Sequence, residues 1–169
     1  FNDLGTVFKE TKNKSISGVA NRNFSLLGDP SMQLALAENE IVFDEVKTSA
    51  GSLELKGLSQ VNITGHLENN LSALTQFNGK LTLTLLSEEV NLITKGDENP
   101  PFNYSDRPNM LFRGNASVSQ GLFELQFIMP KDIPAEFITG KFLASAFDKN
   151  GNFANGIALN NLIGGLESS

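Results

Sequence analysis

Apolar and polar residues alternate with a period of two over most of the chain beyond residue 31. The clearest run is "QVNITGHLEN", in which Val61, Ile63 and Leu67 alternate with polar side chains. Segments 80–86 and 121–130 repeat this pattern with leucine and phenylalanine. Alternation of this kind is typical of a strand with one buried face. These segments are therefore predicted to be strands.

Shorter stretches of the same type predict further strands. They lie at 32–37, 40–46, 53–57, 109–113, 115–119 and 140–147. Turn signals separate the runs at Asn78-Gly79, Gln120-Gly121 and Asn150-Gly151. About seven to nine short strands at this spacing predict an all-β fold, an immunoglobulin-like antiparallel β-sandwich.

The first fourteen residues have a different, helical period. Phe1, Leu4 and Phe8 fall on one face of a helix, and Asn2 or Asp3 precedes it as a candidate cap. Because a helix this short is marginal alone, it must pack against something. We expect the three apolar side chains to be partly exposed or to dock on the sandwich.

A sharp turn separates this helix from the strand-rich part. The residues of interest are Leu26, Leu27, Gly28, Asp29 and Pro30. Glycine permits unusual backbone angles, aspartate bonds to neighbouring N–H groups, and proline stops a strand from continuing. The sequence therefore predicts a domain junction here, between residues 1–30 and 31–169.

Residues 87–109 interrupt the strand pattern. They contain the Pro100-Pro101 pair, an acidic cluster and Tyr104, the one tyrosine of the chain. The segment is predicted to be a long polar loop with a short strand at Val90–Thr94. Loops of this length in compact domains are usually functional or mobile.

Composition narrows the classes of function. The chain has 169 residues and a net charge of −6, and it contains no cysteine. The acidity argues against nucleic acid and anionic lipid as partners. The lack of cysteine removes disulfides, a thiol nucleophile and thiolate metal sites. No apolar run is long enough to insert into a membrane.

The remaining candidate residues do not form a pattern that is typical of an active site. His66, the one histidine, lies on the polar face of its strand and is predicted to be solvated. Segment 148–156 resembles a calcium loop, but its spacing fits a hairpin turn better. Glu88-Glu89 and Asp97-Glu98 are carboxylate pairs with no fixed separation. We therefore assign no catalytic, cofactor-binding or metal-binding residue.

Several motifs resemble one family. "NRNFSLLGDPSMQLA" resembles the junction at the end of gingipain-like cysteine peptidase domains, where a final helix and a short strand lead into an immunoglobulin-like domain. Four further stretches resemble the sortase branch of that family, which serves the type IX secretion system: "LSQVNITGHLEN", "FNGKLTLTLL", "LFRGNASVSQGLFELQFIMPKDI" and "GKFLASAFDKNGNFANG". The resemblance is collinear over nearly the whole chain.

The resemblance implies a parent protein at the cell surface or outer membrane of a Gram-negative bacterium. Such a peptidase removes the C-terminal sorting domain of secreted cargo and joins the new carboxyl end to anionic lipopolysaccharide. Its catalytic dyad is a histidine and a cysteine. Since this chain lacks cysteine and His66 follows the Gly-Asp-Pro turn, the dyad is expected upstream of Phe1.

The resemblance implies that residues 1–30 are the end of a peptidase domain and that residues 31–169 are a non-catalytic segment that braces it. The implied partners are the upstream catalytic domain, an outer-membrane β-barrel shuttle protein and cargo. Two alternatives stay open: a stand-alone surface adhesin or carbohydrate-binding β-sandwich, and a small hydrolase that uses Asp and Glu. The hydrolase would require two carboxylates that converge in a cleft.

Overall fold

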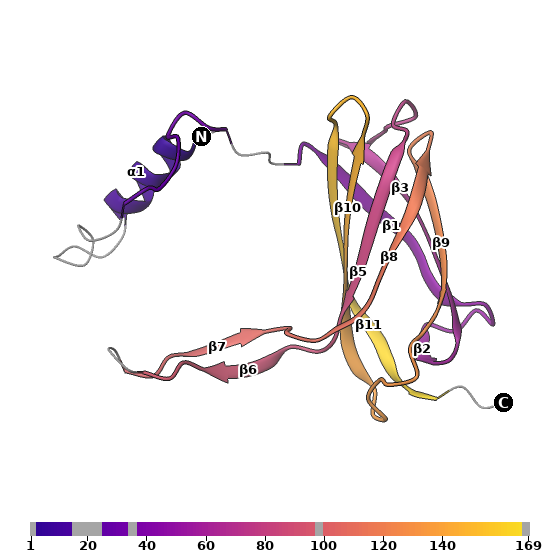
Figure 1. Cartoon of the computed structure of the whole chain (residues 1–169). Coiled ribbons are helices and arrows are strands. Elements are labelled where there is room, and N and C mark those ends of the chain that lie inside the picture. The colour runs from indigo at the N-terminus through magenta and orange to yellow at the C-terminus, as the bar shows by residue number, and fades with distance from the viewer. Residues whose placement is uncertain (1–2, 15–24, 34–36, 97–99, 167–169) are drawn as a thin grey trace. The chain divides into compact units, whose positions relative to one another are not determined.

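The computed structural model describes residues 3–14, 25–33, 37–96, 100–166 (Figure 1). The chain divides into two compact units, 1–36 and 37–169, which are described separately. This division falls six residues after the junction predicted at 30 and 31. That residues 1–30 are the end of a peptidase domain stays a prediction.

The first unit contains the helix α1 (Leu4–Lys14). Asp3 caps it, because its Oδ1 accepts a hydrogen bond of 2.7 Å from the Thr6 amide. No residue of α1 is fully buried, and Leu4 and Phe8 are half-buried. The expected partial exposure is thus confirmed for these two, while Phe1 lies outside the described residues.

The second unit is built from strands joined by short turns. They are β1 (Asn39–Thr48), β2 (Glu54–Gly57), β3 (Gln60–Asn69), β4 (Ser72–Ala73), β5 (Gly79–Leu86), β6 (Val90–Ile93), β7 (Asn103–Asp106), β8 (Met110–Ser119), β9 (Leu122–Ile128), β10 (Ile138–Asp148) and β11 (Phe153–Leu166).

Seven of these strands form a closed barrel, so the predicted immunoglobulin-like β-sandwich is wrong. The hydrogen-bonded order is β1-β11-β10-β5-β8-β9-β3, and β3 returns to pair with β1 over eight residue pairs. β2 and β4 are not members of this ring and pair with β11 and β3, respectively. Period-two alternation identifies an inner face but does not distinguish two stacked sheets from one closed sheet.

The barrel consists of two walls joined by short seams. We call β11-β10-β5-β8 the four-strand wall and β9-β3-β1 the three-strand wall. One seam is a parallel contact in which Asn39 and Glu40 face Ala154 and Asn155. The other joins β8 to β9 beside the Gln120-Gly121 turn, over two residue pairs. Within each wall the strand pairs are much longer.

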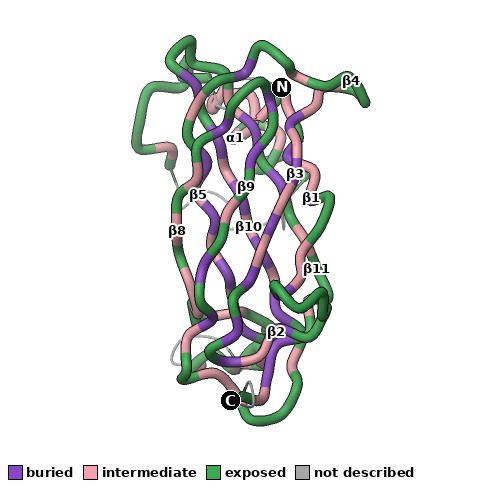
Figure 2. The backbone as a smooth tube through the Cα atoms, turned by 90° about the vertical axis from the view of Figure 1, so that its right-hand side faces the viewer, coloured by how far each residue is buried: buried purple, intermediate pink, exposed green. Residues whose placement is uncertain are grey.

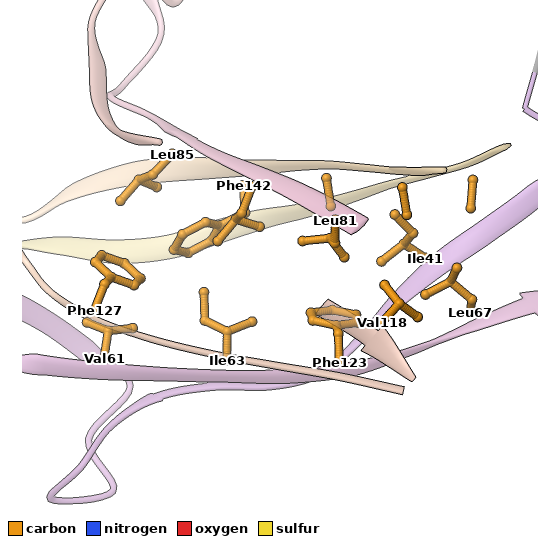
Figure 3. Close-up of a cluster of buried hydrophobic side chains, with 14 of the residues drawn as sticks. Ile41, Val61, Ile63, Leu67, Leu81, Leu85, Val118, Phe123, Phe127 and Phe142 are labelled. Atoms are coloured by element: carbon orange, nitrogen blue, oxygen red, sulfur yellow. The ribbon is translucent and has the colours of Figure 1, made fainter. Parts of the chain in front are cut away.

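The inner faces of both walls form one hydrophobic core (Figure 3). Ile63 and Leu67 come from the three-strand wall, and Leu83 and Phe142 from the four-strand wall; all four are fully buried. Buried and exposed positions alternate along the strands (Figure 2). The inner and outer faces predicted for 60–69, 80–86 and 121–130 are therefore confirmed.

Three details of the strand prediction differ from the structure. Segments 109–113 and 115–119 are one strand, β8. At 32–37 the described part contains only an isolated bridge between Gln33 and Asp3, and residues 34–36 lie outside the description. The strands β4, β7 and β11 were not predicted at all.

Candidate functional site

The predicted junction turn packs on the start of α1, inside the first unit. The Asp29 carboxylate accepts hydrogen bonds from the amide and hydroxyl of Ser31, at 2.8 and 2.7 Å. These bonds hold the pKa of Asp29 below its usual value. The carbonyl oxygen of Pro30 accepts a bond of 2.8 Å from the Gly5 amide.

Gly5 explains how the turn comes so close to the helix. A Cβ at this position would lie 2.9 Å from the Cβ of Pro30, so a larger residue would push the turn away. Leu27 is 96% exposed and Leu26 half-buried. Within this turn Pro30 therefore makes the contact with the start of α1; the role of Leu26 to Pro30 as a junction between domains stays a prediction.

His66 lies on the outside of the three-strand wall between two carboxylates. Its Nδ1 is 2.9 Å from Asp44 Oδ1, and its Nε2 is 3.4 Å from Glu68 Oε2. Asp44 reaches the ring because it occupies a β-bulge, where the register shifts between Phe43 and Glu45. The predicted polar-face position is confirmed, but the imidazole is held in an ion-pair network rather than simply solvated.

This arrangement favours the charged imidazolium. The hydrogen bond from Nδ1 to Asp44 raises the pKa of His66 above its ordinary value, and Glu68 adds to the effect. Both ring nitrogens donate to carboxylates when the ring is protonated. His66 is thus poorly suited to remove a proton from a nucleophile, because its proton-accepting positions are already occupied.

A shallow groove of about 780 Å³ runs beside this cluster. Asp44 and Glu124 both line it, together with hydroxyl groups from Thr64, Ser117 and Ser119. Hydrolysis of a glycoside needs one carboxyl group kept protonated as the acid. Asp44 is paired with His66, and Glu124 accepts a hydrogen bond from Gln126, so both carboxylates of the groove are already engaged.

The predicted polar loop at 87–109 contains a two-stranded arm. β6 matches the strand expected at Val90–Thr94, and it pairs with β7 through partners such as Leu92 and Tyr104. In the described part of the chain no third strand pairs with them. Figure 1 shows the two strands extending away from the barrel.

Arg107 anchors this arm to the barrel. Its Nη1 donates to the carbonyl oxygens of Ser87, at 2.6 Å, and Thr139, at 2.7 Å. Its Nε lies 4.0 Å from the carboxylate of Glu89. Glu89 therefore contributes to the base of the arm; its neighbour Glu88 is exposed, and Asp97-Glu98 lies outside the described residues.

The calcium-like segment is the turn between β10 and β11, as predicted. Asp148 Oδ1 accepts bonds from the amides of Asn150 and Asn152, at 2.8 and 2.9 Å. Across residues 3–14, 25–33, 37–96 and 100–166, no group of three His, Asp or Glu side chains is arranged to hold a metal ion. No helix within those ranges is long and apolar enough to cross a membrane.

Comparison with known proteins gives a structural match over the whole chain. No protein-family model and no curated protein matches the sequence. Among solved structures, dimeric latent PorU from Porphyromonas gingivalis aligns with 100% of this chain at a TM-score of 0.59 and 22% identity. The chain spans 17% of that protein's length.

A weaker match is Spo0M, a sporulation control protein from Bacillus subtilis. It aligns with 78% of this chain and 50% of its own at a TM-score of 0.41 and 12% identity. At 22% identity, the likeness to PorU shows that the fold of this chain is similar to that of one segment of PorU.

Proposed function

We propose that this chain is a non-catalytic segment of a cell-surface, gingipain-like cysteine peptidase related to the type IX secretion sortase PorU. The observation that supports this most is the structural match to PorU over all described parts of the chain. The collinear sequence motifs that resemble the same sortase branch support it independently.

In this proposal the catalytic domain lies upstream, and the barrel braces it. The chain has no cysteine, and both nitrogens of His66 are engaged with Asp44 and Glu68. In our proposal the segment therefore supplies neither member of the His/Cys dyad. The parent would cleave C-terminal sorting signals from exported proteins, and its partners would be the cargo and an outer-membrane β-barrel shuttle.

Peptidase activity is the direct test of this assignment. We expect the chain alone to leave peptide substrates intact, and the full polypeptide encoded by its gene to cleave them. The full polypeptide should lose activity when its cysteine is alkylated. Cleavage by the chain alone, or a full reading frame without a cysteine, would contradict the proposal.

A role in bracing is tested by deletion. Removing residues 37–169 from the full polypeptide should lower the melting temperature of the catalytic domain, since a docked neighbour stabilises by mass action. Adding the separate chain back tests docking in trans. An unchanged melting temperature after deletion would leave the segment without a bracing role.

A further inference from the structure

The four-strand wall carries cations on its outside and almost no anions. Its strands contain three basic residues: Lys80, Arg113 and Lys141. Their one carboxylate is Asp148, which is 7% exposed and bonded to Asn150 and to Asn152. This is unexpected in a chain whose net charge is −6.

Among the described residues, the side chains of these three cations are not engaged by other side chains. None of the three has an ion-pair or hydrogen-bond partner in the parts of the chain that the structure describes. In contrast, the cations of the three-strand wall are paired: Lys47 with Glu45, and His66 with Asp44. Unpaired charge on one wall is therefore available to a partner.

The outward side chains between the cations form regular rows across the wall. Arg113 faces Thr84, Thr84 faces Leu143, and Leu143 faces Ile157. The next row contains only carboxamide and hydroxyl side chains: Asn115, Thr82, Ser145 and Asn155. Apart from Asn115, the residues of these two rows line a groove of about 310 Å³, with the Arg113 guanidinium as its one charge.

Large apolar side chains are exposed on the same wall. Phe147, Ile157 and Leu159 are 54%, 57% and 58% exposed. Exposed apolar groups gathered on one face and mixed with hydrogen-bonding groups are typical of a protein interface. Three cations spread over a wall of this width neutralise too few phosphates for stable binding of nucleic acid.

We propose that the four-strand wall is a docking surface for an acidic protein partner that places carboxylates near Lys80, Arg113 and Lys141 and apolar side chains on Ile157. Charge complementarity selects the acidic class of partner and increases its association rate. The apolar residues between the cations distinguish this surface from a general anion-binding patch. The inference does not depend on the proposed peptidase parentage.

A second copy of the chain is a less suitable partner. Its three-strand wall is acidic, but His66 and Lys47 already neutralise two of the carboxylates there. Docking one wall on the other is also a head-to-tail contact, which makes open chains unless the rotation closes. The favoured occupant is therefore a different protein.

Binding of synthetic acidic polypeptide tests the surface with the whole chain. The probe is a fluorescent copolymer of glutamate and tyrosine, and its anisotropy is titrated with protein at low and at physiological salt. The triple variant K80A/R113A/K141A should bind about tenfold more weakly or worse, with a smaller salt dependence. I157S should weaken binding while keeping the salt dependence of the wild type.

The matched control K47A/K56A/K131A removes the same number of positive charges elsewhere and should bind like the wild type. Several results would overturn the proposal: no binding of the copolymer, equal losses in the two triple variants, or no effect of I157S. Equal binding of polyphosphate would indicate a general anion site instead. Chains formed by the protein alone, and abolished in K80A/R113A/K141A, would identify the partner as a second copy.

Discussion

The two walls of the barrel share a core and differ on the outside. The strands of the three-strand wall carry five carboxylates: Glu40, Asp44, Glu45, Glu68 and Glu124. The strands of the four-strand wall expose three unpaired cations and several apolar side chains. The same inward pattern is thus compatible with opposite outer surfaces, because successive side chains on a strand point to opposite faces. Packing constrains one face and leaves the other free for function.

Removing a core side chain should have the largest effect and should affect both walls together. Phe142 is fully buried and its ring centre lies 6.4 Å from that of Phe43, across the barrel. Phe142→Ala is expected to lower the free energy of unfolding by about 3–5 kcal/mol. Denaturant titration measures this value.

Phe147 provides the matched control, since it lies on the same strand and faces outward. Phe147→Ala should change the free energy of unfolding by no more than about 0.5 kcal/mol. Similar losses in the two variants would show that the outer face of the four-strand wall is not free of packing constraints.

The arm that leaves the four-strand wall depends on one arginine. Arg107→Ala removes two hydrogen bonds from a charged donor to Ser87 and Thr139, each of which contributes roughly 1.5–3 kcal/mol. Hydrogen exchange should become faster in β6 and β7 and stay unchanged in the barrel. Arg113→Ala is the control, because Arg113 has no such bonds in the described structure. Faster exchange in the barrel would mean that the arm is part of its cooperative unit.

Gly156 lies at the seam between the two walls. A Cβ there would lie 2.2 Å from the carbonyl oxygen of Ile41, so Gly156→Ala should separate β11 from β1 and cost about 1–3 kcal/mol. Gly114→Ala is the comparison, because its closest neighbour is the side chain of Phe112 rather than the backbone of another strand. Equal stability of both variants, measured by denaturation, would show that the seam contributes nothing.

The smallest expected effect is a pH-dependent change in the free energy of unfolding that comes from His66 on the three-strand wall. Folding raises the pKa of His66. The imidazolium therefore contributes fully to the free energy of unfolding at pH values below the pKa of the unfolded state, and this contribution is lost as the pH rises through the pKa of the folded state. His66→Gln should therefore destabilise the protein at acidic pH, by up to about 1 kcal/mol, and much less at alkaline pH. Asp44 and Glu68 contact this ring, while Glu40 faces Glu68 and Glu124 faces Thr64 on the neighbouring strands. A stability difference that does not vary with pH would exclude the imidazolium as its cause.

Most of the strands could be predicted from the sequence, and there are physical reasons why the others were missed. β11 was missed because its inner positions are small, such as Ala154 and Gly156, while Ile157 and Leu159 point outward. The apolar residues therefore do not mark the buried face. The collision that a Cβ at Gly156 would make with β1 shows why the inner residues must be small. Alternation of small and large residues was the available signal.

The cluster around His66 could not be predicted from the sequence either. The bulge that brings Asp44 to the ring is a register shift between two strands, and neither strand shows it alone. Glu68 was within reach of prediction, since it lies two residues from His66 on the same face of the strand. Only one strand of the arm, β6, was predicted from the sequence. β7 was missed because it is short, polar and exposed and has no alternating pattern.

By itself, the sequence determined where most strands lie and which side chains face inward, because both follow from local alternation and turn residues. Only the tertiary structure decided that the sheet closes and which strands become neighbours. β5, β8 and β10, which carry the three cations, are separated along the chain, and long-range pairing brings them into one wall. Charged residues on separate strands form one surface only when strand pairing sets the order of the strands. That order depends on contacts between residues that are far apart in the sequence.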